Sequence, residues 1–224
     1  MAKYTIGITG GIGSGKSVVS RILRAWGHEV YDCDSEAKRL MNVSDEIRTR
    51  IVDEVCAEAF DGDGKLQSSV LGAVVFADAE RLARLNAIVH SAVLSDLRRR
   101  AAEASGEIFF VESAIANGSG LTELLDCEWK VTAPETVRIE RVQRRSGLDA
   151  TAIKARIEAQ KAEEQVLPHP LGSCVIDNGG NTGVLPQLEK ALKILPTAVK
   201  MAKNNGKKCK KGTHFTVYLV ILYP

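Results

Sequence analysis

The chain has 224 residues, of which 45% are hydrophobic and 26% charged, a balance that provides a folded core and excludes wholly disordered, collagen-like and coiled-coil architectures. No acidic residue follows Glu189, so residues 1–189 hold 22 basic against 28 acidic side chains, a net charge of −6. An acidic body with 5% aromatic residues lacks the basic, aromatic-lined surface of nucleic-acid binders, so we expect no nucleic-acid partner.

The cysteines and the chain ends predict a cytoplasmic protein. The cysteines are five in number, far apart, and without CxxC or zinc-ligand spacing, as is typical of a reducing compartment. The N-terminal residues resemble neither a signal peptide nor a transit peptide. The apolar run at 215–224 is far below the roughly 20 residues that span a bilayer, so we expect no membrane span and a disordered basic and apolar tail at 201–224.

The first elements form a strand, a glycine-rich turn and a helix. Residues 4–8 are β-rich, and apolar residues then recur at helical spacing over 18–26. A second short strand at 29–31 is followed by a helical segment at 35–41. This alternation predicts the start of a parallel α/β sheet.

A helical block follows and carries no strand signal. One helix is expected over 45–60, with Ser44 as its N-cap and a turn at 61–64, and the longest helical pattern covers 79–104. We therefore expect a helical insertion over about 42–105, beside the main domain of residues 1–200.

Three further apolar runs predict strands at 108–111, 130–133 and 174–176. Helical or loop sequence separates them, and strands that alternate with helices form a mostly parallel, covered sheet. The sequence therefore predicts an α/β fold with ligands bound at the carboxyl ends of its strands.

A phosphate-binding motif, G-x-x-x-x-G-K-[ST], stands between the first strand and its helix. Its glycines let backbone N–H groups turn toward one anion, and the helix adds its positive N-terminal end. The lysine reaches the β and γ phosphates of a nucleotide, and the Ser17 hydroxyl provides a ligand for Mg²⁺. The motif consists of Gly10, Gly11, Ile12, Gly13, Ser14, Gly15, Lys16 and Ser17.

Two aspartates flank Cys33 at the carboxyl end of the second predicted strand. Because residues two apart in an extended segment point to the same side, Asp32 and Asp34 form a pair. One of them can accept the proton of a substrate hydroxyl and the other can help to hold Mg²⁺ or its waters. The alternative for each is an N-cap of the following helix.

A strand-end acid and an arginine cluster complete the candidate site. Glu112 ends its predicted strand at a position where an acid can lie near a metal. The alternative is a carboxylate at the strand end without such a role. Arg141, Arg144 and Arg145 share one face of a helix and could neutralise charge on a transferring phosphoryl group from a mobile lid. Exposed arginines balanced by neighbouring acids are the alternative.

Seven motifs in this order and spacing together resemble the dephospho-CoA kinase family over about residues 4–195. They are TGGIGSGKS at 9–17, DCD at 32–34, DGDGKL at 61–66, LNAIVH at 85–90, ERVQRRSG at 140–147, RIEAQ at 156–160 and VIDNGG at 175–180. The resemblance implies a three-layer P-loop kinase fold with a parallel five-stranded sheet, a helical insertion that cradles the pantetheine arm, and a lid at about 141–165.

The resemblance also implies a reaction, the ATP-dependent phosphorylation of the ribose 3′-hydroxyl of dephospho-CoA, with Mg²⁺. By motif match, Asp34 is the base, Lys16, Arg141 and Arg144 are catalytic, and further residues bind the adenine side or orient the acceptor. Those on the adenine side are Asp177 and Asn178, and those on the acceptor side are Asp32, Asn86, His90 and Glu112.

Other functions share part of this pattern. A nucleotide or shikimate kinase uses the same loop and paired aspartates, and a nucleotide-dependent switch uses the loop alone. A third alternative is a binding module without catalysis, which Val18 and the sequence at 116–118 would fit because they depart from the family pattern.

Overall fold

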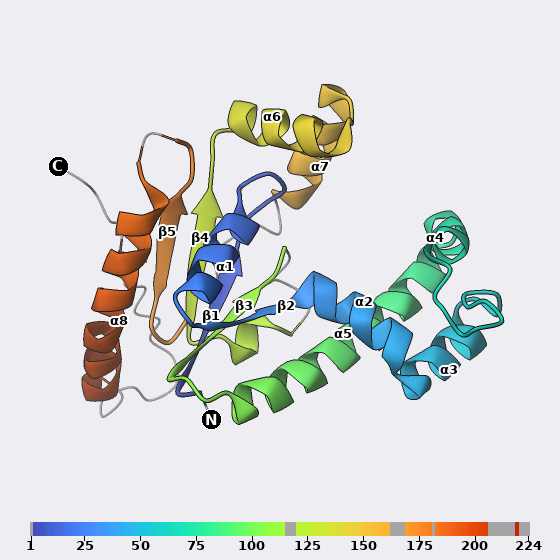
Figure 1. Cartoon of the computed structure of the whole chain (residues 1–224), viewed down its shortest axis with the longest axis horizontal. Coiled ribbons are helices and arrows are strands. Elements are labelled where there is room, and N and C mark those ends of the chain that lie inside the picture. The colour runs from blue at the N-terminus through green and yellow to red at the C-terminus, as the bar shows by residue number, and fades with distance from the viewer. Residues whose placement is uncertain (1, 115–119, 162–168, 181, 206–217, 220–224) are drawn as a thin grey trace. The chain divides into compact units, whose positions relative to one another are not determined.

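The computed structural model describes residues 2–114, 120–161, 169–180, 182–205 and 218–219 (Figure 1). The chain divides into two compact units. Unit 1 comprises the residues up to Val30 and those from Ala104 onward, and unit 2 comprises Tyr31–Glu103. The segments at 116–118 and 162–168 lie outside the described residues.

The sheet has the strand order β2-β3-β1-β4-β5-β6, and the neighbours from β3 through β6 pair in parallel. The parallel α/β fold predicted from the sequence is therefore confirmed, with the two-residue β6 added to the five longer strands. The strands are β1 (Tyr4–Thr9), β2 (Glu29–Asp32), β3 (Ile108–Glu112), β4 (Cys127–Thr132), β5 (Ser173–Asp177) and β6 (Tyr218–Leu219).

The core of unit 1 lies on one face of this sheet, under α1 (Lys16–Ala25) and α8 (Val184–Asn205). Ile6 and Ile8 of β1 pack there with Val19 and Leu23 of α1, and all four are fully buried. Each such side chain contributes about 1.5–3 kcal/mol on burial. The packing fixes the end of β1 against the start of α1, the two elements that the glycine-rich loop joins.

β4 begins earlier than the sequence predicts. The expected strand runs over 130–133, whereas the structure has Cys127–Thr132, because the charged Glu128 interrupts the apolar pattern and yet is buried. Its carboxylate accepts a hydrogen bond from the Thr9 hydroxyl (2.5 Å) and lies 3.2 Å from Nε2 of His169. Partners distant in the sequence thus allow an acidic residue in a central strand.

The segment in which a lid is expected contains α6 (Glu135–Ser146) and α7 (Ala150–Gln160), both in unit 1. Val142, Ile153 and Ile157 are buried between them, and Ile12 of the glycine-rich loop packs against this cluster. Gly147, at φ +67°, ends α6, and the Asp149 carboxylate caps α7. The two helices therefore form one hairpin in contact with the loop.

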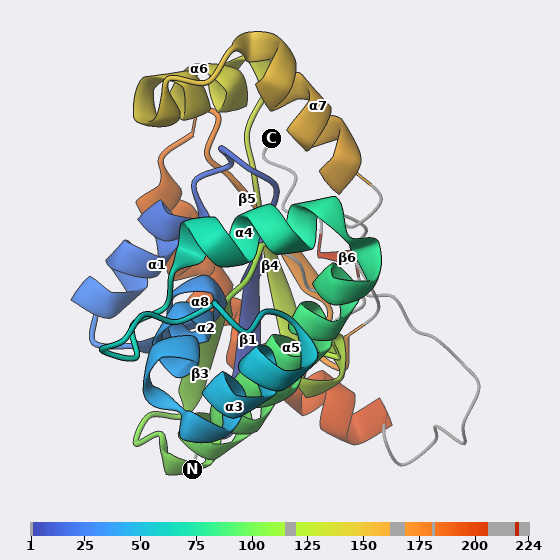
Figure 2. The same ribbon diagram turned by 90° about the vertical axis from the view of Figure 1, so that its right-hand side faces the viewer.

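Unit 2 is a helical unit with its own core, formed by α2 (Cys33–Val43), α3 (Asp45–Glu54), α4 (Ser68–Ala77) and α5 (Ala79–Glu103) (Figure 2). Ile51 of α3, Leu71 and Val75 of α4, and Ile88 of α5 are buried together. The predicted N-cap is confirmed, since the Ser44 hydroxyl accepts a hydrogen bond from the Ile47 N–H. The unit begins at Tyr31 and so includes α2, ahead of the insertion start expected near residue 42.

The helix expected over 45–60 is too long, because α3 ends at Glu54. The chain turns at Val55, whose carbonyl accepts a hydrogen bond from the Arg81 guanidinium of α5 (3.0 Å). Phe60 then forms an isolated antiparallel bridge with Leu66 around the turn at 61–64. A contact from a distant helix thus satisfies the end of α3, and no local signal predicts it.

At the C-terminus, α8 continues through Asn205, past the expected start of the tail at residue 201. Lys200, Met201, Ala202 and Lys203 favour helix, so the local composition extends it. Most of the predicted tail lies outside the described residues, and Tyr218–Leu219 forms β6. None of the described helices has both the length and the apolar character needed to cross a bilayer.

Candidate active site

The glycine-rich loop joins β1 to α1 as the motif predicts. Gly10, Gly13 and Gly15 all have positive φ, which other residues rarely adopt. Space also requires glycine at these positions: a Cβ on Gly10 would lie 2.2 Å from the Val131 carbonyl oxygen, one on Gly13 would lie 2.6 Å from the Arg138 carbonyl oxygen, and one on Gly15 would lie 2.0 Å from Nδ2 of Asn178. The loop is thus packed directly against α6 and the end of β5.

The loop presents an environment suited to an anion. It leads into the N-terminus of α1, whose first turn carries no acidic residue. The Lys16 ammonium donates to the Gly10 carbonyl (2.6 Å), which places its positive charge over the loop. The Ser14 side chain is 1% exposed, and its hydroxyl has no hydrogen-bond partner among the described residues. A phosphate oxygen would satisfy this donor.

Arg141 of α6 contacts the end of β5 and the glycine-rich loop. Its guanidinium donates to the Asn178 carbonyl (2.8 Å) and lies 3.4 Å from the Ser14 carbonyl. Arg144 is instead exposed and pairs with Glu140 (2.6 Å), and Arg145 is exposed as well. The exposed alternative thus describes Arg144 and Arg145, whereas Arg141 is the arginine of this group that contacts the loop.

Sequence reasoning missed two residues that hold the loop. Nε of Arg138, a buried side chain, donates to the Ile12 carbonyl (2.8 Å). Gln160, at the end of α7, accepts a hydrogen bond from the Ile12 N–H (2.8 Å). The three-residue spacing of Arg138 and Arg141 on α6 was an available signal, because such residues share a helix face.

Asn178 and Asp177 follow β5 and differ in what they contact. Nδ2 of Asn178 donates to the Ser14 carbonyl (2.9 Å), so Asn178 braces the loop that precedes α1. The Asp177 carboxylate accepts from the Gly179 N–H (2.8 Å) and from the Thr182 hydroxyl (3.4 Å). Asp177 therefore shapes the turn that presents Asn178.

The two aspartates of the DCD motif also have different environments. Asp32 is the N-cap of α2: one carboxylate oxygen accepts from the N–H groups of Asp34 (3.1 Å) and Ser35 (3.3 Å), and the other accepts the Ser35 hydroxyl (2.8 Å). Asp34 is exposed in the first turn, and its carboxylate makes no hydrogen bond or ion pair with the described residues. The capping alternative therefore applies to Asp32, and Asp34 is available to a substrate.

The remaining acceptor-side candidates lie on two elements. Asn86 and His90 are on α5 of unit 2, four residues apart on one helix face, and both are exposed. Glu112 ends β3 in unit 1, level with Ile8 of β1 just before the loop. Among the described residues, no group of three or more His, Cys, Asp or Glu side chains is placed to hold a metal ion.

The parallel sheet, the loop before α1, and the lysine and arginine over that loop define a P-loop kinase. The family model for dephospho-CoA kinase matches residues 4–183. The chain belongs to the dephospho-CoA kinase family, which confirms the resemblance drawn from the seven motifs and the prediction of a kinase.

Similar proteins agree with this assignment. A dephospho-CoA kinase of Bacteroides fragilis is 36% identical over 204 residues, which cover 89% of this chain and 98% of the relative. One of Thermus thermophilus is 37% identical over 188 residues, 84% of this chain and 88% of the relative. A crystal structure from Thermus thermophilus is 35% identical and superposes with a TM-score of 0.68, covering 88% of this chain and 98% of its own. A nucleotide or shikimate kinase is therefore not favoured.

Proposed function

We propose that the protein transfers the γ-phosphoryl group of ATP to the ribose 3′-hydroxyl of dephospho-CoA, giving coenzyme A and ADP. The observation that carries this proposal is the phosphate loop, with Arg141 and Asn178 bound to its backbone, in a member of the dephospho-CoA kinase family. Phosphoryl transfer is catalysed mainly by positioning and by neutralising charge, and these residues provide both.

On the nucleotide side, the backbone N–H groups of residues 10–17 and the positive end of α1 bind the phosphate oxygens. Lys16 and Arg141 offset the negative charge that spreads over the transferring group. Arg144 contributes less in this proposal, because its exposed pair with Glu140 directs it toward solvent. Asp177 and Asn178 lie on the adenine side, where Asn178 also holds the loop.

On the acceptor side, Asp34 acts as the general base. Its carboxylate accepts the proton of the 3′-hydroxyl while the hydroxyl oxygen bonds to the γ-phosphorus and the bond from that phosphorus to the bridging oxygen of ADP breaks. Asp32 contributes through its cap, which fixes the turn that carries Asp34. Asn86, His90 and Glu112 orient the acceptor.

ATP and Mg²⁺ fit the residues of the loop. The buried Ser14 hydroxyl lacks a partner among the described residues, and the Ser17 hydroxyl is exposed in the first turn of α1 beside Lys16. Mg²⁺ commonly takes one or two protein ligands and completes its shell with water and substrate phosphates, so one serine suffices. When bound, Mg²⁺ supplies further neutralisation of phosphate charge.

A cytoplasmic location also remains our proposal. Cys56, Cys127 and Cys174 are buried thiols, and none is in a disulfide. Burial raises the pKa of the Cys127 and Cys174 thiols to about 12, so both stay protonated at neutral pH. Thiols of this kind suit a reducing compartment.

The test is coupled ADP release with ATP and Mg²⁺ and separate acceptors: dephospho-CoA, AMP, CMP, shikimate and none. We expect turnover with dephospho-CoA only, and none with Lys16→Ala, which serves as the control for contaminating kinases. Turnover with another acceptor would replace the substrate in this proposal. ADP release without any acceptor would indicate a nucleotide-dependent switch or ATPase instead.

A further inference from the structure

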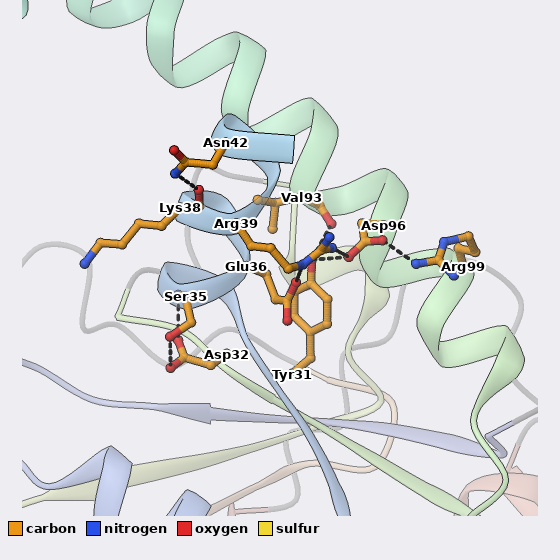
Figure 3. Close-up of polar contacts among 10 residues, drawn as sticks. All are labelled: Tyr31, Asp32, Ser35, Glu36, Lys38, Arg39, Asn42, Val93, Asp96 and Arg99. Atoms are coloured by element: carbon orange, nitrogen blue, oxygen red, sulfur yellow. Dashed lines mark hydrogen bonds and ion pairs between the residues drawn. The ribbon is translucent and has the colours of Figure 1, made fainter. Parts of the chain in front are cut away.

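A largely covered carboxylate on α5, that of Asp96, joins three other side chains of unit 2 (Figure 3). The side chain of Asp96 is 9% exposed, and it accepts hydrogen bonds from the Tyr31 hydroxyl (3.1 Å), the Arg39 guanidinium (3.2 Å) and the Arg99 guanidinium (2.6 Å). The Tyr31 hydroxyl also lies 3.4 Å from the Val93 carbonyl. We call Asp96, Tyr31, Arg39 and Arg99 the Asp96 cluster.

The charges of the Asp96 cluster are arranged to keep it intact at neutral pH. Arg39 also pairs with Glu36 (2.5 Å), and Arg99 pairs with Glu103 (2.7 Å). Burial alone would raise the pKa of Asp96, but hydrogen bonds from Arg99 and Tyr31 and the charges of both arginines outweigh it and leave the pKa below its usual value. Burial and the Asp96 charge raise the pKa of Tyr31, which therefore remains a hydrogen-bond donor.

The Asp96 cluster holds α2 on both sides of its first turn. Tyr31 immediately precedes Asp32, the N-cap of α2, and Arg39 lies within the helix. Within the same turn, the Asp32 carboxylate accepts a hydrogen bond from the Asp34 N–H. Figure 3 shows Tyr31 and Arg39 converging on Asp96 of α5, with Asp32 and Ser35 at the start of α2. The place of Asp34 relative to α5 thus depends on Asp96.

We propose that Asp96 is a positioning residue for phosphoryl transfer, which acts through Tyr31 and Arg39 to fix the first turn of α2, and with it Asp34, relative to α5, the helix that carries Asn86 and His90. The inference rests on the proposed function. It gives Asp96 a role in that function although Asp96 touches no reacting atom. The Arg39 and Arg99 side chains are 45% and 53% exposed, and exposed ion pairs add little to stability, so stability alone does not account for the cluster. Directional hydrogen bonds are what fix a turn, and an error of 1 Å at a reacting group can cost about a hundredfold in rate.

The experiment is a double-mutant cycle of Asp96→Asn with Asp34→Asn in the full chain, measuring kcat and the KM values for ATP and dephospho-CoA. We expect Asp96→Asn to lower kcat about tenfold or more and to leave the KM for ATP unchanged. In the Asp34→Asn background, the same substitution should cause no further loss. Tyr31→Phe, which removes one hydroxyl and keeps the ring, repeats the cycle if Asp96→Asn does not fold.

The matched control is Glu54→Gln, which removes a carboxylate that binds Arg50 on α3 of the same unit (2.8 Å). It should leave kcat unchanged. A second measurement does not depend on activity: hydrogen exchange at the N–H groups of Asp34 and Ser35 should become faster in Asp96→Asn and in Tyr31→Phe, but not in Glu54→Gln.

The inference would be overturned if Asp96→Asn lowered kcat by the same factor in the wild type and in Asp34→Asn. It would also be overturned if Asp96→Asn left kcat unchanged while Asp34→Asn lowered it. Either result would leave the proposed function standing. Near-normal kcat in Asp34→Asn itself would overturn the assignment of the base, and the inference with it. The inference would be supported if Asp96→Asn lowered kcat in the wild type but caused no further loss in Asp34→Asn, and if hydrogen exchange in the first turn of α2 became faster.

Discussion

Substitution of Gly15 tests how strictly the structure constrains the phosphate loop. Gly15 has φ +96°, and a Cβ there would lie 2.0 Å from Nδ2 of Asn178, which donates to the Ser14 carbonyl. Gly27 has a similar φ of +87°, but a Cβ there would meet no atom within 4 Å. Gly27→Ala is therefore a matched control, because it introduces the backbone strain without the collision.

The expected magnitudes follow from these contacts. An alanine at positive φ costs about 1–2 kcal/mol, so Gly27→Ala should lower the free energy of unfolding by that amount and leave ATP affinity unchanged. Gly15→Ala should cost about 1 kcal/mol more, because Asn178 must move and lose its hydrogen bond to Ser14. Since the displaced loop also binds the phosphates in our proposal, ATP affinity should fall at least about tenfold.

Urea denaturation measures the first quantity and calorimetric titration with ATP the second. The double variant Gly15→Ala with Asn178→Ala removes the colliding atoms, so its loss of stability should be smaller than the sum of the two single losses. Equal stability and ATP affinity in Gly15→Ala and Gly27→Ala would refute the argument that the loop is packed against Asn178.

Three further predictions concern unit 1. Arg141→Ala should lower kcat about a hundredfold. Arg144→Ala breaks only an exposed pair with Glu140 and should change kcat less than about fivefold. Steady-state assays of the two variants measure this difference in kcat. Glu128→Ala leaves the Thr9 hydroxyl and Nε2 of His169 without their buried acceptor and should lower the free energy of unfolding by about 1–3 kcal/mol in urea, with a smaller loss for Glu128→Gln, which keeps an acceptor. The pKa of the Cys174 thiol is about 12 in the folded state against an ordinary 9.0, so the thiol loses its proton first in the unfolded state, and the free energy of unfolding should fall as pH rises above about 9. Cys174→Ala should make this fall less steep in unfolding measurements from pH 8 to about 10. An unchanged slope would contradict the argument that burial raises this pKa.

Local patterns predicted those parts of the molecule whose contacts are short in sequence. The phosphate loop, the N-cap at Ser44 and the long helix α5 each depend on neighbouring residues, and the structure places all three where they were expected. The paired aspartates were predicted as a pair, but the sequence left the capping role open for both. Only the geometry of the turn distinguishes Asp32, whose oxygens bind its N–H groups, from the exposed Asp34.

The parts that were missed depend on contacts between distant residues. Arg138 and Gln160 both bind Ile12, from which they are 126 and 148 residues distant along the chain. The start of β4 was missed because buried partners for Glu128 cannot be recognised in a local window. The same holds for the end of α3, where Arg81 of another helix donates to the Val55 carbonyl. Three-dimensional contacts, and not local preference, decided these positions.

In the proposed mechanism, Asp34 removes the proton of the 3′-hydroxyl during transfer. The most direct test is a single-turnover rapid-quench measurement of CoA formation by wild type and Asp34→Asn, with ATP affinity measured on the same samples. We expect the transfer rate of Asp34→Asn to be at least about a hundredfold lower, with unchanged ATP affinity and unchanged thermal midpoint. A transfer rate close to that of the wild type would contradict it.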